Sequence, residues 1–199
     1  SFALFKELND LERFDEAWAA LDYGCRAKRA KLSYDKAQTA RLFDVLKQSR
    51  LRLDQQSQVD ASVTPIFIVG MHRSGTTLLE RILGGHSAVT DGGESYGFSV
   101  SMRRHANQSG NGVVDITLAE KLAGASAQGL AEDYRAHNHS RSNGRPFLTE
   151  KLPSNFLNLG FIAEALPEAR FLHLVRDQME TCFGNLRVLF SEAAAYSYQ

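Results

Sequence analysis

Residues 70–77 combine two glycines, an arginine and three hydroxyl side chains in one short segment. An apolar run at residues 65–69 precedes the segment, and a helical pattern begins at Thr76. A loop that leads from a buried strand into a helix N-terminus offers free N–H groups, which attract an anion. The spacing fits G-x-x-x-x-G-x-[ST], but Thr76 stands where an NTP-binding loop needs Lys, and the cation of the loop is Arg73.

This arginine indicates which anion the loop suits. Without the lysine, a site that must neutralise a β- or γ-phosphate lacks its main charge. An arginine fork can grip two oxygens at once and suits a terminal 5′-phosphate or phosphosulfate better. The segment therefore predicts nucleotide binding rather than an ATPase, and its candidate ligands are Arg73, Ser74, Gly75, Thr76 and Thr77.

Short β-branched or apolar runs alternate with helical patterns from residue 65 onward. This alternation predicts an α/β fold, in which a P-loop-like parallel sheet is flanked by helices. The expected strands are 66–69, 88–90, 147–150 and 171–175, and the expected helices are 76–84, 154–166 and 178–190. Ligands of such sheets lie beyond the carboxyl ends of the strands, where Gly70, Glu150 and Arg176 fall.

Two stretches between these elements carry weaker patterns. Residues 99–112 are polar and rich in glycine, which predicts a mobile loop, and the polar stretch 137–144 predicts another loop. Thr117 and Glu120 form a capping-box pattern that predicts the start of one long helix, with Leu118, Leu122, Leu130 and Tyr134 on its apolar face.

The first fifty residues have helical spacing and predict a small N-terminal helical segment, with an apolar stripe at Leu4, Leu8, Leu11, Phe14, Trp18, Leu21 and Cys25. Residues 11–18 resemble the turn and second helix of a tetratricopeptide repeat; a plain helical hairpin is the alternative. The expected organisation is a helical segment at 1–54, a polar linker at 55–64 and an α/β domain at 65–199.

The composition limits the function classes. Lys plus Arg and Asp plus Glu both number 23, so no overall basic charge favours nucleic acid as a partner. No apolar run reaches the length of a membrane span. The two cysteines, Cys25 and Cys182, have neither disulfide-framework nor metal-site spacing, which favours a reducing compartment and predicts a cytoplasmic protein.

Three ordered motifs resemble those of sulfotransferases that use 3′-phosphoadenosine 5′-phosphosulfate. Residues 73–77 are similar to the family's 5′-phosphosulfate loop, residues 150–156 to its D-K-x-P-x-N-F segment, and residues 171–177 to its strand that ends in Arg-Asp. The forms that these motifs take in this sequence are most similar to those of the branch with protein-tyrosine sulfotransferases and bacterial sulfotransferases that carry tetratricopeptide repeats. The resemblance implies transfer of a sulfuryl group to a hydroxyl acceptor, adenosine 3′,5′-bisphosphate as the product, and no metal.

The resemblance also implies roles for individual residues. Glu94 is the candidate general base, and Lys151 is the candidate cation at the leaving group. Arg176 is the candidate ligand of the 3′-phosphate, and Asn155 of the cofactor or an adjacent loop. The family usually has a serine where Gly184 stands, and Asn185 is the candidate to replace it.

The chain departs from the family pattern in two milder ways, with Glu150 in place of Asp and Gln178 in place of Pro. By the same resemblance, a full domain of this type continues for roughly another hundred residues.

Several alternatives stay open. An atypical P-loop kinase would need Asp177 as an improvised metal ligand and lacks the loop lysine, whereas Gly184 favours a non-catalytic nucleotide-binding or repeat-scaffold module. The acceptor is a peptide tyrosine, a sugar, a lipid or a small alcohol, and a homodimer is compatible with the sequence. The rival bases to Glu94 are His86, His105, His137 and His139.

Overall fold

The computed structural model describes residues 1–53, 63–190 and 192–198, and the chain divides into two compact units. The first unit consists of Ser1–Lys36 and Arg176–Gln199, and the second of Ala37–Val175. Most of the expected linker at 55–64 lies outside the described residues, so the domain boundaries inferred from the sequence stay a prediction. Each unit is described by itself.

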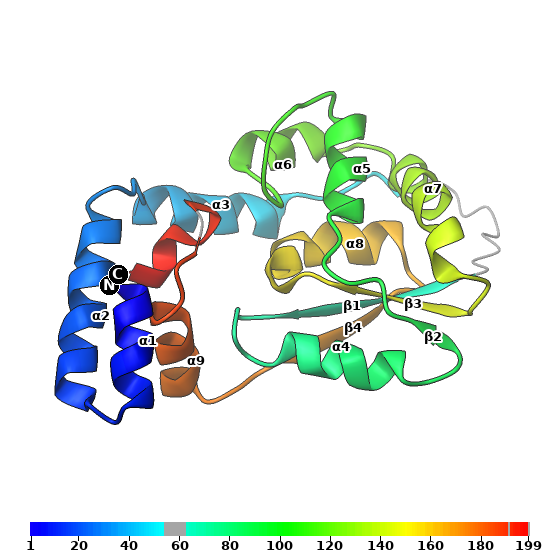
Figure 1. Ribbon diagram of the computed structural model, residues 1–199. Coiled ribbons are helices and arrows are strands. Elements are labelled where there is room, and N and C mark those ends of the chain that lie inside the picture. Colours follow the sequence, from blue (N-terminus) through cyan, green and yellow to red (C-terminus); the bar gives the residue numbers. More distant parts are fainter. Residues whose placement is uncertain (54–62, 191, 199) are drawn as a thin grey trace. The chain divides into compact units, whose positions relative to one another are not determined.

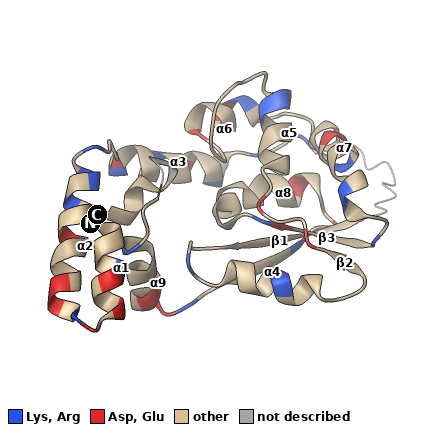
Figure 2. Ribbon diagram, viewed as in Figure 1, with Lys and Arg blue, Asp and Glu red and all other residues tan. Residues whose placement is uncertain are grey.

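The first unit is helical (Figure 1). Its elements are α1 (Phe2–Asp10), α2 (Phe14–Arg29), α9 (Gln178–Leu186) and the 3-10 helix η3 (Glu192–Tyr198). Its buried core contains Phe5, Leu8, Ala17, Leu21, Cys25 and Tyr198. Acidic residues occupy the first turn of α2 and basic residues its last turn, which complements the helix dipole (Figure 2).

The predicted apolar stripe of this unit is only half buried. Leu8, Leu21 and Cys25 lie in the core. Four further members of the stripe remain exposed, at 53% for Leu4, 66% for Leu11, 62% for Phe14 and 55% for Trp18. The α1–α2 hairpin therefore has several apolar side chains that face solvent in this structure.

The second unit is built on a parallel sheet of four strands in the order β2-β3-β1-β4. The strands are β1 (Thr64–Gly70), β2 (Val89–Thr90), β3 (Phe147–Lys151) and β4 (Arg170–Leu174). The register pairs Ile68 with Lys151 and Gly70 with Leu174, so three neighbouring strands end at one edge. The α/β fold predicted from the sequence is confirmed.

Helices lie on both faces of this sheet (Figure 1). On one face lies α4 (Thr76–Gly84), and on the other lie α5 (Gly97–His105), α7 (Ala127–Asn138) and α8 (Leu159–Ala165). Phe67 of β1 is fully buried beneath the second group, with its ring centroid 6.3 Å from that of Phe98 and 5.9 Å from that of Tyr134. The same unit contains α6 (Ile116–Leu122) and, apart from its first residue, α3 (Lys36–Gln48).

The mobile loop predicted at 99–112 is wrong over its first half, which belongs to α5. Phe98 and Met102, one turn apart, are fully buried, and Ser99 and Ser101 are buried with them. The Nδ2 of Asn158 donates to Ser99 Oγ at 3.1 Å. A small hydroxyl with a hydrogen-bond partner can sit in a core, so the polar composition was misleading here.

The single long helix predicted from Thr117 is also wrong. The chain forms two helices, α6 and α7, because Gly124 lies between them at φ 78°, in the left-handed region that ends helices. The side chain of Asp115, rather than Thr117, caps α6 by accepting from Leu118 N at 2.8 Å. Residues 140–142 of the loop predicted at 137–144 form a 3-10 turn, and residues 137 and 138 belong to α7.

The helix expected at 154–166 starts as the 3-10 helix η2 (Pro153–Asn158) before it continues as α8. None of the helices that the structure describes is both long and apolar enough to cross a membrane.

Candidate active site

The loop between β1 and α4 forms the predicted anion cradle. Gly75 is the N-cap of α4 at φ 105°, a conformation that glycine adopts without strain. Arg73 also has a positive φ, 68°, which is uncommon for a residue with a side chain and is concentrated at functional sites. The Oγ of Ser74 is buried and has no hydrogen-bond partner among the described residues. A buried hydroxyl without a partner beside a helix N-terminus fits a site that takes an anion.

Glu94 and Lys151 meet at the end of β3. The Nζ of Lys151 lies 2.5 Å from Oε1 of Glu94. The lysine side chain is 5% exposed, whereas the glutamate side chain is 62% exposed. The pair thus consists of a buried ammonium, the last residue of β3, and a carboxylate that a molecule from solvent can reach.

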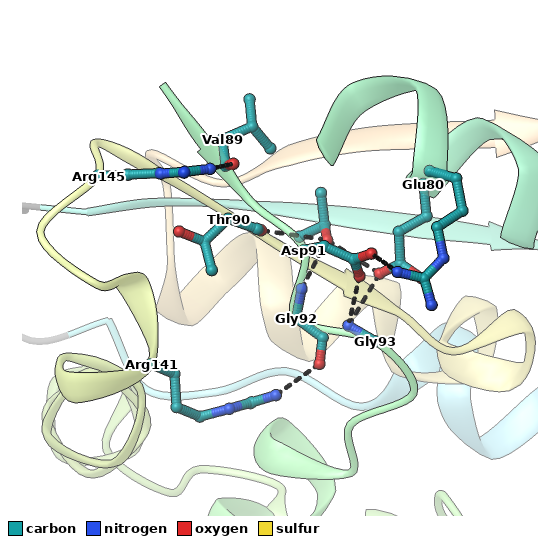
Figure 3. A network of polar contacts seen from close by, with 10 residues as sticks. Glu80, Val89, Thr90, Asp91, Gly92, Gly93, Arg141 and Arg145 are labelled. Carbon is teal, nitrogen blue, oxygen red and sulfur yellow. Dashed lines mark hydrogen bonds and ion pairs between the residues drawn. The ribbon is translucent and has the colours of Figure 1, made fainter. Parts of the chain in front are cut away.

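The loop that carries Glu94 rests on β3 and α4 (Figure 3). Gly92 N donates to Oγ1 of Thr149 at 3.0 Å, and Gly93 N donates to Oε1 of Glu80 at 3.0 Å. From the other side, Nη2 of Arg141 donates to Gly92 O at 2.7 Å. These bonds occupy the main-chain polar groups of the loop and hold it in one conformation.

Gly92 is required by this close approach. A Cβ at this position would lie 2.0 Å from the carbonyl oxygen of Thr149, which no side chain could avoid without moving the backbone. The sequence pattern Gly-Gly-Glu therefore places the candidate base on a backbone that lies directly against the neighbouring strand.

His72 is a residue of this site that the sequence analysis missed. It is half-buried in the anion loop, and burial lowers the pKa of its imidazole. The charge of Glu94 raises this pKa and that of Lys151 lowers it, so the imidazole is close enough to feel both groups. Its position next to Arg73 in the anion loop is the sequence feature that could have identified it.

Behind Lys151, Glu150 lies in a buried polar network. Its Oε2 accepts from the hydroxyl of Tyr134 at 3.1 Å, and its Oε1 accepts from Nδ2 of Asn155 at 3.1 Å. Burial raises the pKa of Glu150 to about 7, and these hydrogen bonds to the ionised form only partly oppose the shift.

Asn155 is fully buried, and Nδ2 of Asn158 donates to its Oδ1 at 3.2 Å. Asn155 thus supports the strand end that carries Lys151. A direct contact of its side chain with a nucleotide stays a prediction.

Arg176 and Asn185 belong to the first unit, and their contacts are described within that unit. Arg176 Nε donates to Oε2 of Glu180 at 2.6 Å, and both side chains of this ion pair are more than half exposed. Asp177 caps α9 by accepting from Glu180 N at 2.9 Å. Asn185 is 3% exposed, and its Nδ2 donates to Thr181 O at 2.7 Å. The roles of Arg176 and Asn185 as 3′-phosphate ligands stay predictions.

Within the ranges that the structure describes, no group of three His, Cys, Asp or Glu side chains could hold a metal ion. The structure brings together the anion loop, Glu94 and Lys151 in the second unit, since Ile68 of β1 pairs with Lys151 of β3. The arrangement offers an anion cradle, a cation and an accessible carboxylate at one sheet edge.

Two comparisons with known proteins found a match to this chain. The chain is 27% identical over 205 residues to a protein of Aquifex aeolicus (strain VF5) described as an uncharacterized protein. The match covers 96% of this chain but only 26% of that relative, so the chain spans about a quarter of the relative's length. No solved structure matches the chain. The model of a sulfotransferase family matches residues 65–199, and the chain therefore belongs to the sulfotransferase family.

Proposed function

We propose that this protein transfers a sulfuryl group from 3′-phosphoadenosine 5′-phosphosulfate to a hydroxyl acceptor. The observation that carries the proposal is the pair of Glu94 and Lys151, whose Oε1 and Nζ lie 2.5 Å apart; Lys151 ends β3, the strand that pairs with β1 before the anion loop. A carboxylate that can take a proton and an ammonium that can stabilise an anion are the two groups that such a transfer needs.

The residues of the anion loop fit the 5′ end of this donor. The N–H groups in the first turn of α4, the Arg73 guanidinium and the Ser74 hydroxyl, which has no partner among the described residues, would hold the phosphosulfate oxygens. For the 3′-phosphate we propose Arg176 and Asn185, and this assignment rests on the sequence motifs alone. When bound, the donor supplies the sulfuryl group and the leaving 3′,5′-bisphosphate.

Glu94 is the group that accepts the proton of the acceptor hydroxyl, since its carboxylate is the exposed member of the pair. Lys151 is the cation that stabilises negative charge that develops at the leaving oxygen. Because its side chain is buried, this charge acts where little water screens it. The main contribution of the loop is to hold the two reactants in line.

The donor class is tested by calorimetric titration of the protein with adenosine 3′,5′-bisphosphate and, separately, with ATP and magnesium. We expect the bisphosphate to bind more tightly, and Arg176→Ala to weaken its binding tenfold or more. A preference for ATP with magnesium would overturn the proposal in favour of a kinase.

The acceptor class is tested by transfer of labelled sulfate from the donor to a tyrosine peptide, an amino sugar, a lipid alcohol and a simple phenol. Transfer to the tyrosine peptide would favour the protein-tyrosine sulfotransferase branch. No transfer to any of these probes by a protein that binds the bisphosphate would favour a non-catalytic nucleotide-binding module.

A further inference from the structure

Glu80 is a buried acid to which the proposed chemistry gives no role. It is 2% exposed and lies on α4, one turn after Thr76. A fully buried carboxylate is unusual unless its oxygens are paired. Its Oε1 accepts from the hydroxyl of Thr149 at 2.9 Å and from Gly93 N at 3.0 Å. Both partners are neutral, so this carboxylate does not serve as half of an ion pair with them.

The contact with Gly93 joins two parts of the site (Figure 3). Gly93 directly precedes Glu94, and its carbonyl oxygen accepts from Lys151 N at 3.1 Å. The two polar main-chain groups of Gly93 are therefore bound on opposite sides, one by α4 and one by β3. A shift of either partner would move the backbone that carries the Glu94 side chain.

The first turn of α4 is also the anion cradle, since Gly75 caps this helix and Glu80 lies one turn further along. A helix of nine residues with continuous backbone hydrogen bonds moves as one body. The side chain of Glu80 thus links the cradle helix to the Gly93 amide, which also donates to Oδ1 of Asp91 at 3.2 Å.

We infer that Glu80 is a positioning residue, which ties the helix of the anion cradle to the Gly92–Glu94 loop and so keeps the Glu94 carboxylate beside Lys151. The inference rests on the proposed function of Glu94 as the base. It assigns to Glu80 no contact with the substrate and no proton transfer. Its effect is on the geometry of the base relative to the bound donor, where small displacements have large effects on rate.

The experiment compares three variants of the full chain: Glu80→Ala, Glu80→Gln and a control, Glu168→Ala. Glu168 has a half-buried carboxylate that pairs with Arg135 at 2.8 Å. We assign neither of these two side chains a part in the site. The measurements are kcat with the labelled donor and the best acceptor probe, and the dissociation constant of adenosine 3′,5′-bisphosphate.

We expect Glu80→Ala to lower kcat at least tenfold while the dissociation constant changes less than twofold. Glu80→Gln keeps an oxygen that can accept from Gly93 N and Thr149 Oγ1, and it should restore most of kcat. Glu168→Ala should change neither quantity. A glutamine variant as slow as the alanine variant, or an alanine variant with normal kcat, would overturn the inference.

Hydrogen exchange of the Gly93 amide gives a second readout that does not depend on activity. The exchange should be at least tenfold faster in Glu80→Ala than in the wild type, and near wild type in Glu80→Gln. The two ideas fail in different ways. A wild-type protein that transfers no sulfuryl group would refute the proposed function, whereas unchanged exchange of the Gly93 amide in Glu80→Ala would refute the role of Glu80. If Glu80→Ala does not fold, Thr149→Val removes the hydroxyl that bridges Glu80 and Gly92 N and should give the same pattern in smaller degree.

Discussion

Replacing Glu150 by Gln is expected to remove a pH dependence of folding stability that the wild-type protein shows near neutrality. Two effects oppose each other at this carboxyl group. Burial disfavours its charged form, whereas the Tyr134 hydroxyl, the Asn155 amide and Phe98 N donate hydrogen bonds that favour it. Burial is the larger effect, so the pKa rises from 4.5 to about 7 on folding.

The sign and size of the effect follow from linkage. A group whose pKa is raised by folding contributes stability that is complete below its unfolded pKa and is lost as the pH rises through its folded pKa. One pH unit is worth about 1.4 kcal/mol, so the whole change amounts to about 3 kcal/mol. Between about pH 5.5 and pH 8, the free energy of unfolding should fall by about 2 kcal/mol from this group alone.

The assay is urea denaturation followed by far-ultraviolet circular dichroism at several pH values in that range. The quantity to compare is the wild-type value minus the Glu150→Gln value, because contributions that the substitution leaves unchanged cancel in this difference. Tyr134→Phe removes one donor to the ionised form and should move the midpoint of the wild-type loss to higher pH. A difference that stays constant within about 0.5 kcal/mol from pH 5.5 to pH 8 would refute the reasoning and show that the hydrogen bonds at least offset burial.

Three further predictions concern the loops of the site. Glu94→Gln should lower kcat by about 10²–10⁴ with unchanged affinity for the bisphosphate, measured by steady-state kinetics and calorimetry; a variant with most of its kcat would exclude Glu94 as the base. Arg73→Ala should weaken bisphosphate binding at least tenfold, because a charge-assisted contact is worth about 1.5–3 kcal/mol; unchanged affinity in a folded variant would exclude this contact. Gly92→Ala should destabilise the fold by about 1–3 kcal/mol in urea denaturation, since its Cβ would meet Thr149 O at 2.0 Å. In contrast, the control Gly160→Ala, where a Cβ meets nothing within 4 Å, should be neutral or stabilising.

The parts of the site that could be predicted from the sequence are those that local pattern determines. The anion loop follows an apolar strand and opens a helix within residues 64–84, so the spacing of glycine, arginine and threonine carries the information. The end of β3 is also set by local pattern, because the strand expected at 147–150 stops just before Lys151, one residue short of the observed end. Parallel strands end at a common edge, which explains why these separate segments were predicted to meet.

What the sequence could not reveal depends on contacts between distant segments. Glu80 has the spacing of an ordinary helix residue, and only its bond to Gly93, thirteen residues away, shows what it holds. Asn155 is the predicted ligand of the cofactor or of an adjacent loop, and the motif could not show that its amide bonds to Glu150 and Asn158 inside the unit. The helix α5 was missed because its serines are buried and bonded rather than exposed.

The exposure of apolar side chains on the α1–α2 hairpin has a spectroscopic consequence. Trp18 of this hairpin is the single tryptophan of the chain, and it is 55% exposed. Its indole is therefore expected to emit at the long wavelengths of a water-exposed tryptophan in the folded protein, and to change little on unfolding. Any partner or neighbouring segment that covers the hairpin should move the emission to shorter wavelength, so the native fluorescence of this one side chain reports coverage of that surface without an added label.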